Sequence, residues 1–514
     1  MQSNLIAFLV FYILHIFPCK SYAQWTTPFV WDVNASNSLA TFEVKNSSTG
    51  QVKMITVSLD LGSSGFAAGI STVYPVTSDI DPVLPLPKGP KDAYQIVPDS
   101  LVYQSYGSGN YSAYMATTLL NVNGEYTNVT LGAMFEYSPP FPMGGPKNDV
   151  GILGLSWYST NQPPPFCTNG SVPDVTNDER SCDPVTDAVI NYPLLNQLNS
   201  SGLIKRNTVE MIFLGSTQSM DRYGNLTYGN DQPTYDGVSV DLQKIYGLEY
   251  GSYYIISVPS ISVGNNTLPY SEVELQGNTT RLIEGTDYWF GGWVVDSGWN
   301  YDLFPLNVYD NLTSAIWSNY NGSDISQEQW NMLVSNGKTD DCTKVPDWCA
   351  PLQDVPCVVL NSTAWHELPT ITYVIGENNE SSWDYHPKDY LYPIYEVSPT
   401  TKCYQLGLLG LEDEKAIIGN LHMSGNQVFM DQDNKTATIT PVPPSSAPTP
   451  APTPAPSPAP SPAPSPEPSP TPTSVTPSNS SSNSSTRRDI VIGGICAIAA
   501  FFFIMVISTN RQRG

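Results

Sequence analysis

The sequence predicts an all-β protein whose folded body has two lobes. Between residues 24 and 440, short runs rich in Val, Ile, Tyr and Thr are separated by Gly, Asn and Pro, which is the pattern of strands and turns. Helical periodicity is scarce. Roughly four hundred residues of this pattern exceed what one sandwich needs, so we expect two β lobes. Representative strands are expected at 41–44, 54–59, 209–214, 254–258 and 371–375.

The charge balance is strongly acidic. The 514 residues carry a formal net charge of −25, from 47 acidic and 22 basic side chains. Such a surface repels the phosphates of nucleic acids, so we expect no nucleic-acid partner. The self-repulsion eases as carboxylates become protonated, which suits a mildly acidic environment.

Residues 1–23 have the organisation of a secretory signal peptide. An apolar run from Leu5 to Phe17 is followed by small residues that end at Ala23, and we expect cleavage there. The run is too short to favour a membrane-spanning helix, and an uncleaved anchor is the alternative. The two lobes are then expected at 24–214 and 215–441.

Two further segments follow the expected lobes. Residues 442–486 repeat Pro, Ala, Ser and Thr, a composition that cannot bury a core, so we expect a disordered stalk. Residues 490–508 form an apolar run that is long enough to cross a hydrocarbon core of about 30 Å. We expect one transmembrane helix, a cytoplasmic tail at 509–514 and a single-pass type I protein of the cell membrane with its body outside. A GPI anchor and a vacuolar or endosomal membrane are the alternatives.

The cysteines agree with an oxidising compartment. Setting aside Cys19 in the signal peptide and Cys496 in the apolar run leaves six of the eight cysteines, an even number that suits disulfides. The spacings suggest the pairs Cys167 with Cys182 and Cys342 with Cys349, leaving Cys357 with Cys403. A zinc site is the alternative, but no paired CxxC spacing occurs, so we expect neither a metal nor a cofactor.

Potential N-glycosylation sequons are spread along the chain, as expected of a glycosylated outer surface. They include Asn46, Asn128, Asn225, Asn278, Asn311, Asn361 and Asn434.

Two segments repeat one design, in which an apolar strand ends in Asp, one further residue and Gly. The first contains Asp60 and Gly62, and the second contains Asp296 and Gly298. A carboxylate at the end of a buried strand is costly unless it is hydrogen-bonded or paired. Two such carboxylates facing each other would share one proton, because like charges so close cannot both ionise.

These motifs resemble the Asp-Thr-Gly and Asp-Ser/Thr-Gly signatures of the pepsin-like aspartic proteases. Other segments are similar to elements of that family and occur in the family's order, over roughly residues 40 to 442. They are a flap hairpin with Tyr106, Gly107, Ser108 and Gly109, a Gly-Ile-Leu-Gly-Leu element at 151–155, a helix and strand at 194–214, and the segments 416–420 and 428–431.

The resemblance implies a two-lobed pepsin-like fold with an active cleft between the lobes. It also implies an aspartic endopeptidase that cuts proteins or peptides, at acid pH outside the cell, with Asp60 and Asp296 as the catalytic pair. The hairpin with Tyr106 would close over the substrate. Support for the two carboxyl groups is expected from Gly62, Ser63, Ser297 and Gly298. The family's disulfide in the second lobe corresponds to Cys357 and Cys403, and we expect a monomer.

Three residues depart from the family's pattern. Leu61 stands where the family has a Thr whose hydroxyl braces both carboxylates, and Trp299 and Asn300 replace hydroxyl residues. Losing one hydrogen bond to a charged group costs about 1.5–3 kcal/mol, or roughly ten- to over a hundredfold in rate. The alternatives to a protease are therefore a catalytically inactive relative that binds a peptide, glycan or protein at the cell surface, and a structural coat glycoprotein.

Overall fold

The computed structural model describes residues 24–32, 37–45, 50, 52–63, 65–69, 95–106, 109–137, 151–156, 193–215, 223–243, 245–246, 253–268, 289–290, 292–339, 357–411 and 416–443. All of them lie in one compact unit that ends at Thr449. The expected signal peptide, nearly all of the stalk and the apolar run at 490–508 lie outside the described residues. No helix within the described ranges is long and apolar enough to span a membrane.

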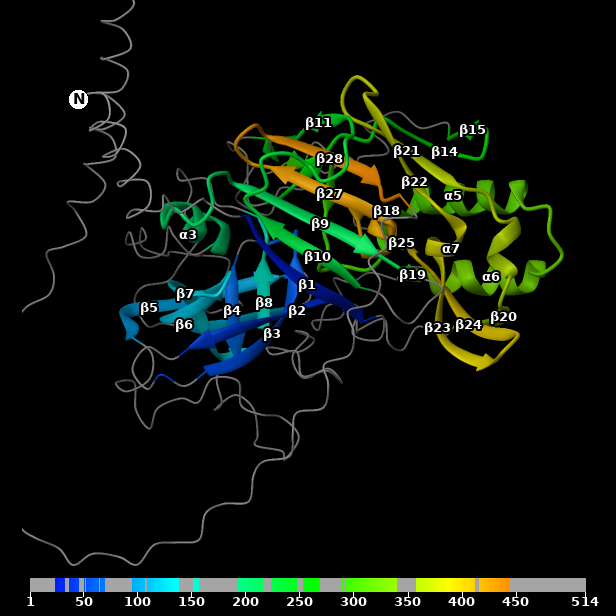
Figure 1. Ribbon diagram of the computed structural model, residues 1–514. Coiled ribbons are helices and arrows are strands. Elements are labelled where there is room, and N and C mark those ends of the chain that lie inside the picture. The colour runs from blue at the N-terminus through cyan, green and yellow to red at the C-terminus, as the bar shows by residue number, and fades with distance from the viewer. Residues whose placement is uncertain are drawn as a thin grey trace, which may run out of the picture. The chain divides into compact units, whose positions relative to one another are not determined.

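The described part of the chain is mostly β, and its largest sheet has thirteen strands (Figure 1). In sheet order they are β11 (Ser239–Asp241), β28 (Thr436–Pro441), β27 (Asn426–Asp431), β9 (Thr208–Leu214), β10 (Tyr223–Tyr228), β1 (Trp25–Asp32), β2 (Asn37–Lys45), β3 (Val52–Asp60), β8 (Gly151–Gly154), β4 (Phe66–Gly69), β7 (Glu125–Tyr137), β6 (Gly109–Val122) and β5 (Gln95–Tyr106). Strands β27 and β28, orange in Figure 1, lie beside the green strand β9. The sheet therefore joins the two ends of the folded body.

Four smaller sheets belong to the second half of the body. A six-stranded sheet has the order β13 (Ile255–Ile256), β17 (Trp293–Val295), β26 (Ile417–Ile418), β18 (Asp302–Pro305), β25 (Leu408–Leu411) and β19 (Lys338–Thr339). A four-stranded sheet has the order β15 (Asn266–Thr267), β14 (Ser260–Val263), β21 (Ile371–Ile375) and β22 (Ser381–Tyr385). The others are β20 (Val358–Asn361), β24 (Thr401–Leu406) and β23 (Leu391–Ser398), and the pair β12 (Ile245–Tyr246) and β16 (Trp289–Phe290).

The local sequence explains the strands. Strand β21 alternates buried and half-buried side chains along Ile371–Ile375, as a strand with one covered face does. The β6–β7 hairpin turns at Asn123 and Gly124, which both have positive φ, the conformation that Asn-Gly adopts readily. Four of the five representative strands are present in β2, β3, β9 and β21, whereas the one expected at 254–258 shortens to β13. The all-β prediction is confirmed.

The expectation of scarce helices overlooked two of them. Helix α5 (Leu306–Asn319) buries one face of apolar side chains, and α6 (Gln327–Asn336) begins with a capping box between Ser326 and Gln329. That box is a readable start signal. The shorter helices are α3 (Leu194–Ser200), α7 (Pro387–Tyr390), α8 (Asn420–Met423) and the 3-10 helix η2 (Ala364–Glu367).

Aromatic side chains fill the core beside the strand that carries Asp296. Trp293 is fully buried, and its ring meets those of Phe304 and Tyr373 edge-on at centroid distances of 5.2 and 5.5 Å. A disulfide joins Cys357 to Cys403, the pair that the resemblance implied. Cys167, Cys182, Cys342 and Cys349 lie outside the described residues.

Candidate active site

Asp60 and Asp296 are delivered by the same local architecture. Asp60 ends β3, which pairs in parallel with β8, and Asp296 follows β17, which pairs in parallel with β26. We call Asp60 with β3, β8 and β4 the N-terminal half-site, and Asp296 with β17, β26 and β18 the C-terminal half-site. Each half-site ends its strand in an Asp-x-Gly turn, so both motifs found in the sequence have the same backbone setting.

The fold brings the two carboxyl groups together. They share a hydrogen bond, and each accepts a bond from the glycine amide of its own turn, Gly62 N to Asp60 Oδ1 and Gly298 N to Asp296 Oδ1, both at 2.8 Å. Neither glycine has room for a side chain. A Cβ on Gly62 would lie 2.5 Å from Asp296 Cγ, and one on Gly298 would lie 2.7 Å from Asp60 Oδ1.

Both carboxyl groups have raised pKa values. Burial raises the pKa of Asp60, against the hydrogen bonds that it accepts. Burial also raises the pKa of Asp296 well above its usual range, and the charge of Asp60 raises it further. Two adjacent carboxyl groups in a dry site hold on to a shared proton, because ionising both would place like charges in contact.

The Ser297 hydroxyl braces the backbone of β3 from the other half-site. Ser297 Oγ accepts from Leu61 N at 2.9 Å and donates to Leu59 O at 3.0 Å. The equivalent position in the N-terminal half-site is Leu61, which is fully buried and has no hydroxyl. The brace that the family builds from two hydroxyls is therefore one-sided in this chain.

The other predicted support residues contribute less. The Ser63 hydroxyl helps to lower the pKa of Asp60, although it makes no hydrogen bond of regular geometry. Trp299 turns its ring toward Tyr301, at 6.2 Å between centroids, and packs against the core. The side chain of Asn300 is buried, and neither of its polar atoms has a hydrogen-bond partner in the structure. No hydroxyl from these two positions therefore supports Asp296.

One family model matches part of the chain. Residues 253–440 match the family model of the xylanase inhibitor C-terminal domain, which belongs to the pepsin-like aspartic protease superfamily. The fold is pepsin-like and bilobal. Xylanase inhibitors are inactive members of that superfamily. No curated protein matches the chain.

The hairpin of the predicted flap is part of this pepsin-like fold. Strands β5 and β6 pair up to Tyr106 and Gly109, so the backbone closes where the motif was expected. Gly107 and Ser108 lie outside the described residues. The role of the hairpin in covering a substrate stays a prediction.

Tyr253 is a further tyrosine that the two carboxyl groups affect. Its side chain is 36 % exposed. Desolvation by neighbouring protein, followed by the charges of Asp60 and Asp296, raises its pKa. A tyrosine directly before an apolar strand carries no distinctive signal, so only the folded arrangement reveals it.

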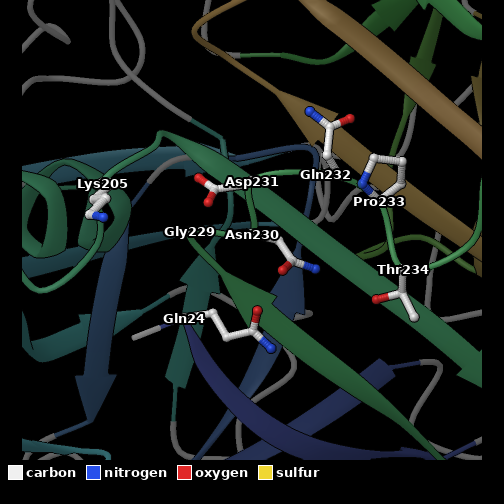
Figure 2. Close-up of a pocket in the computed structure, with 8 residues that line it drawn as sticks. All are labelled: Gln24, Lys205, Gly229, Asn230, Asp231, Gln232, Pro233 and Thr234. Carbon is white, nitrogen blue, oxygen red and sulfur yellow. The ribbon is translucent and has the colours of Figure 1, made fainter. Parts of the chain in front are cut away.

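A separate polar pocket of about 410 Å³ lies along the segment that follows β10 (Figure 2). Its lining consists of Gln24, Lys205, Gly229, Asn230, Asp231, Gln232, Pro233 and Thr234. The side-chain amide of Asn230 donates a hydrogen bond of 2.9 Å to the buried carboxylate of Glu210. None of the lining residues belongs to the Asp60–Asp296 site.

Within the described ranges, no group of His, Cys, Asp and Glu could hold a metal ion.

Proposed function

We propose that the protein is an aspartic endopeptidase that hydrolyses peptide bonds with a water molecule activated between Asp60 and Asp296. The observation that carries this proposal is the pair itself. Two carboxyl groups from separate strands share a hydrogen bond, and both have raised pKa values. Burying two carboxyl groups together opposes folding, and their arrangement suits general acid and base catalysis.

The chemistry follows from the shared proton. The ionised carboxylate takes a proton from the water as its oxygen attacks the peptide carbonyl, and the protonated carboxyl group donates to the carbonyl oxygen. A proton then passes to the leaving amine as the carbon–nitrogen bond breaks. Which carboxyl group begins protonated is a property of the pair.

The sequence supports an acidic, extracellular setting for this activity. The predicted signal peptide, the sequons and the stalk favour secretion, and the apolar run at 490–508 favours attachment to the cell membrane through one helix. Substrates would be proteins or peptides, and we expect the protein to act as a monomer.

A second candidate is a catalytically inactive protein whose cleft binds a partner at the cell surface. Two observations favour it. Leu61 removes half of the hydroxyl brace, and the matching family model is named for inhibitors of xylanase. On this hypothesis the Asp60–Asp296 pair would be a remnant of an active ancestor.

Proteolysis across pH separates the two candidates. The purified full-length protein is incubated with a denatured protein substrate from about pH 3 to about pH 7, with and without pepstatin. Asp296→Ala is the test variant, and Asp241→Asn, on the exposed strand β11, is the control. We expect cleavage in acid that pepstatin and Asp296→Ala abolish and Asp241→Asn retains. A folded wild type that cleaves at no pH would contradict the protease and favour the binding protein.

A further inference from the structure

A hydrogen-bonded pair of titratable residues, Asp302 and His422, lies buried in the C-terminal half-site. Asp302 and His422 are 0 and 1 % exposed, and His422 Nδ1 lies 2.7 Å from Asp302 Oδ2. The same carboxylate oxygen accepts a bond from the Tyr373 hydroxyl at 2.6 Å. A buried carboxyl group opposes folding unless it has hydrogen-bond partners, and both oxygens of Asp302 have them.

Packing alone does not require these two residues. His422 sits among three aromatic rings, stacked on Tyr385 at 4.3 Å and close to Trp383 and Tyr373 at 4.3 and 4.5 Å. Its Nε2 atom has no hydrogen-bond partner. The titratable side chains around the pair include Tyr373, whose hydroxyl bonds Asp302, and Tyr385, whose ring stacks on His422 and whose hydroxyl donates to Gly407 O. Burial, and then the charge of Asp302, raises the pKa values of both tyrosines.

The N-terminal half-site shows that an apolar residue can fill the position of Asp302. Phe66 follows Asp60 by six residues and pairs with Leu153 of β8, just as the segment after Asp296 pairs antiparallel with β26 at Leu303 and Ile417. Phe66 is fully buried. In that half-site the amide of Gly154 bonds the backbone oxygen of Gly65 at 2.6 Å.

In the C-terminal half-site, a side chain replaces that backbone acceptor. The amide of Gly419 donates to Asp302 Oδ1 at 2.9 Å. Gly419 lies inside the segment 418–421, which four hydrogen bonds join to the turn that carries Asp296. Asp296 N donates to Ile418 O at 2.9 Å, and Asn420 Nδ2 donates to Ser297 O at 2.5 Å. The amides of Asn420 and Leu421 donate to Trp299 O at 2.7 Å and to Asn300 O at 3.0 Å.

We propose that Asp302, oriented by His422 and Tyr373, is a positioning residue for Asp296. Through the Gly419 amide it fixes the segment 418–421, and that segment fixes the turn from Asp296 to Asn300. The same hydrogen bonds hold Ser297, whose hydroxyl bonds the backbone at Leu59 and Leu61. Asp302 and His422 thereby make the C-terminal half-site more rigid, and with it the hydroxyl that connects the two half-sites. This inference rests on the proposed protease function, and it concerns only how that site is held.

Two tyrosines of the same lobe provide a matched test. Tyr373 and Tyr390 are both fully buried, and each hydroxyl donates one bond of 2.6 Å, to Asp302 Oδ2 and to Pro369 O respectively. Tyr373→Phe and Tyr390→Phe should therefore lower the unfolding temperature by similar amounts. We expect Tyr373→Phe alone to lower kcat, by about threefold to tenfold with little change in KM, because small misplacements of catalytic groups are costly. Equal kcat values and equal pH profiles for the two variants would overturn the proposal.

Replacing Asp302 and His422 together separates a positioning role from a role in stability. His422→Phe leaves Asp302 buried without its partner and should lower the unfolding temperature strongly, whereas Asp302→Leu with His422→Phe should recover most of that loss. The double variant deprives Gly419 of its acceptor, so we expect its kcat to stay at least about tenfold below the wild type. A stable double variant with wild-type kcat and pH profile would overturn the proposal. If the double variant does not fold, the tyrosine pair decides.

A readout without substrate keeps the inference separate from the proposed function. The pH dependence of the unfolding temperature, compared between wild type and Asp296→Asn, reports the proton of the carboxyl pair. Tyr373→Phe should shift that difference along the pH axis and Tyr390→Phe should not. If the wild type cleaves no substrate, the protease proposal fails, and an unshifted difference in Tyr373→Phe would then overturn the positioning role as well.

Discussion

On one side of the site Asp60 is followed by Leu61 and, six residues on, by Phe66, whereas on the other side Asp296 is followed by Ser297 and Asp302. The backbones of the two half-sites correspond, with a parallel strand pair and an Asp-x-Gly turn in each. Their side chains differ, because Leu61 and Phe66 are apolar, whereas Ser297 and Asp302 make hydrogen bonds.

This difference indicates where each half-site obtains its rigidity. The side chains of Leu61 and Phe66 are fully buried and contribute close packing, while backbone amides supply the hydrogen bonds of their turn. Ser297 instead binds the backbone of β3 across the two half-sites, and Asp302 binds Gly419 within its own half-site. A hydrogen bond fixes the orientation of a catalytic group as well as its position. Removing one partner of a buried hydrogen bond costs free energy, because the other partner is left unsatisfied.

The largest expected effect tests whether the unequal half-sites still act as one unit. Asp60→Asn and Asp296→Asn should each lower kcat by about 10²- to 10⁴-fold, because acid and base share one proton and neither works alone. Steady-state kinetics on a peptide substrate measures the two losses. One variant that keeps activity within tenfold of the wild type would show that the carboxyl groups are not a unit.

The next effect tests how closely the two turns approach. Gly62→Ala and Gly298→Ala should each lower kcat by about 10²-fold, because the added methyl group would displace the opposite carboxylate. Kinetics reports the loss, and thermal unfolding reports whether the chain still folds. Full activity in either alanine variant would mean that the turns lie farther apart than in this structure.

Removing the hydroxyl at Ser297 and adding one at Leu61 tests how much each position contributes to the brace between the half-sites. Ser297→Ala removes two hydrogen bonds and should lower kcat about tenfold. Leu61→Thr introduces the missing hydroxyl and should raise kcat about threefold to tenfold over Leu61→Val, which has the same branched shape. Both Leu61 variants should lose about 1–3 kcal/mol of stability from reduced apolar burial. No difference between Leu61→Thr and Leu61→Val would contradict the idea that the brace is incomplete.

The smallest expected effect concerns stability against pH. A carboxyl group whose pKa is raised in the folded protein stabilises the fold fully below its ordinary pKa, and this contribution is lost as pH rises through the folded value. Asp296 has such a raised pKa. Asp296→Asn should therefore unfold at a higher temperature than the wild type at neutral pH, and the two should converge in acid. Scanning calorimetry across pH would measure this, and a variant less stable at neutral pH would contradict the raised pKa.

Much of the candidate site was predictable because its elements are local. The apolar strand before Asp60, the Asp-x-Gly turns and the hairpin around Tyr106 each occupy a few consecutive residues with a clear pattern. Helix α5 is hard to predict because its polar residues resemble those of the surrounding loops, whereas the capping box of α6 is a local signal of its start. No local motif marks Asp302, so its role was not predictable from the sequence.

The order of amino acids was enough to place two carboxylates at the ends of two buried strands and to show that Leu61 lacks a hydroxyl. Those facts depend on alternation and turn residues within short segments. It was not enough to show that Ser297 bonds the backbone at Leu61, 236 residues away in the chain, or that Asp302 finds His422 and Gly419. Such contacts arise from the pairing of distant strands, so they cannot be predicted from the sequence of any single segment.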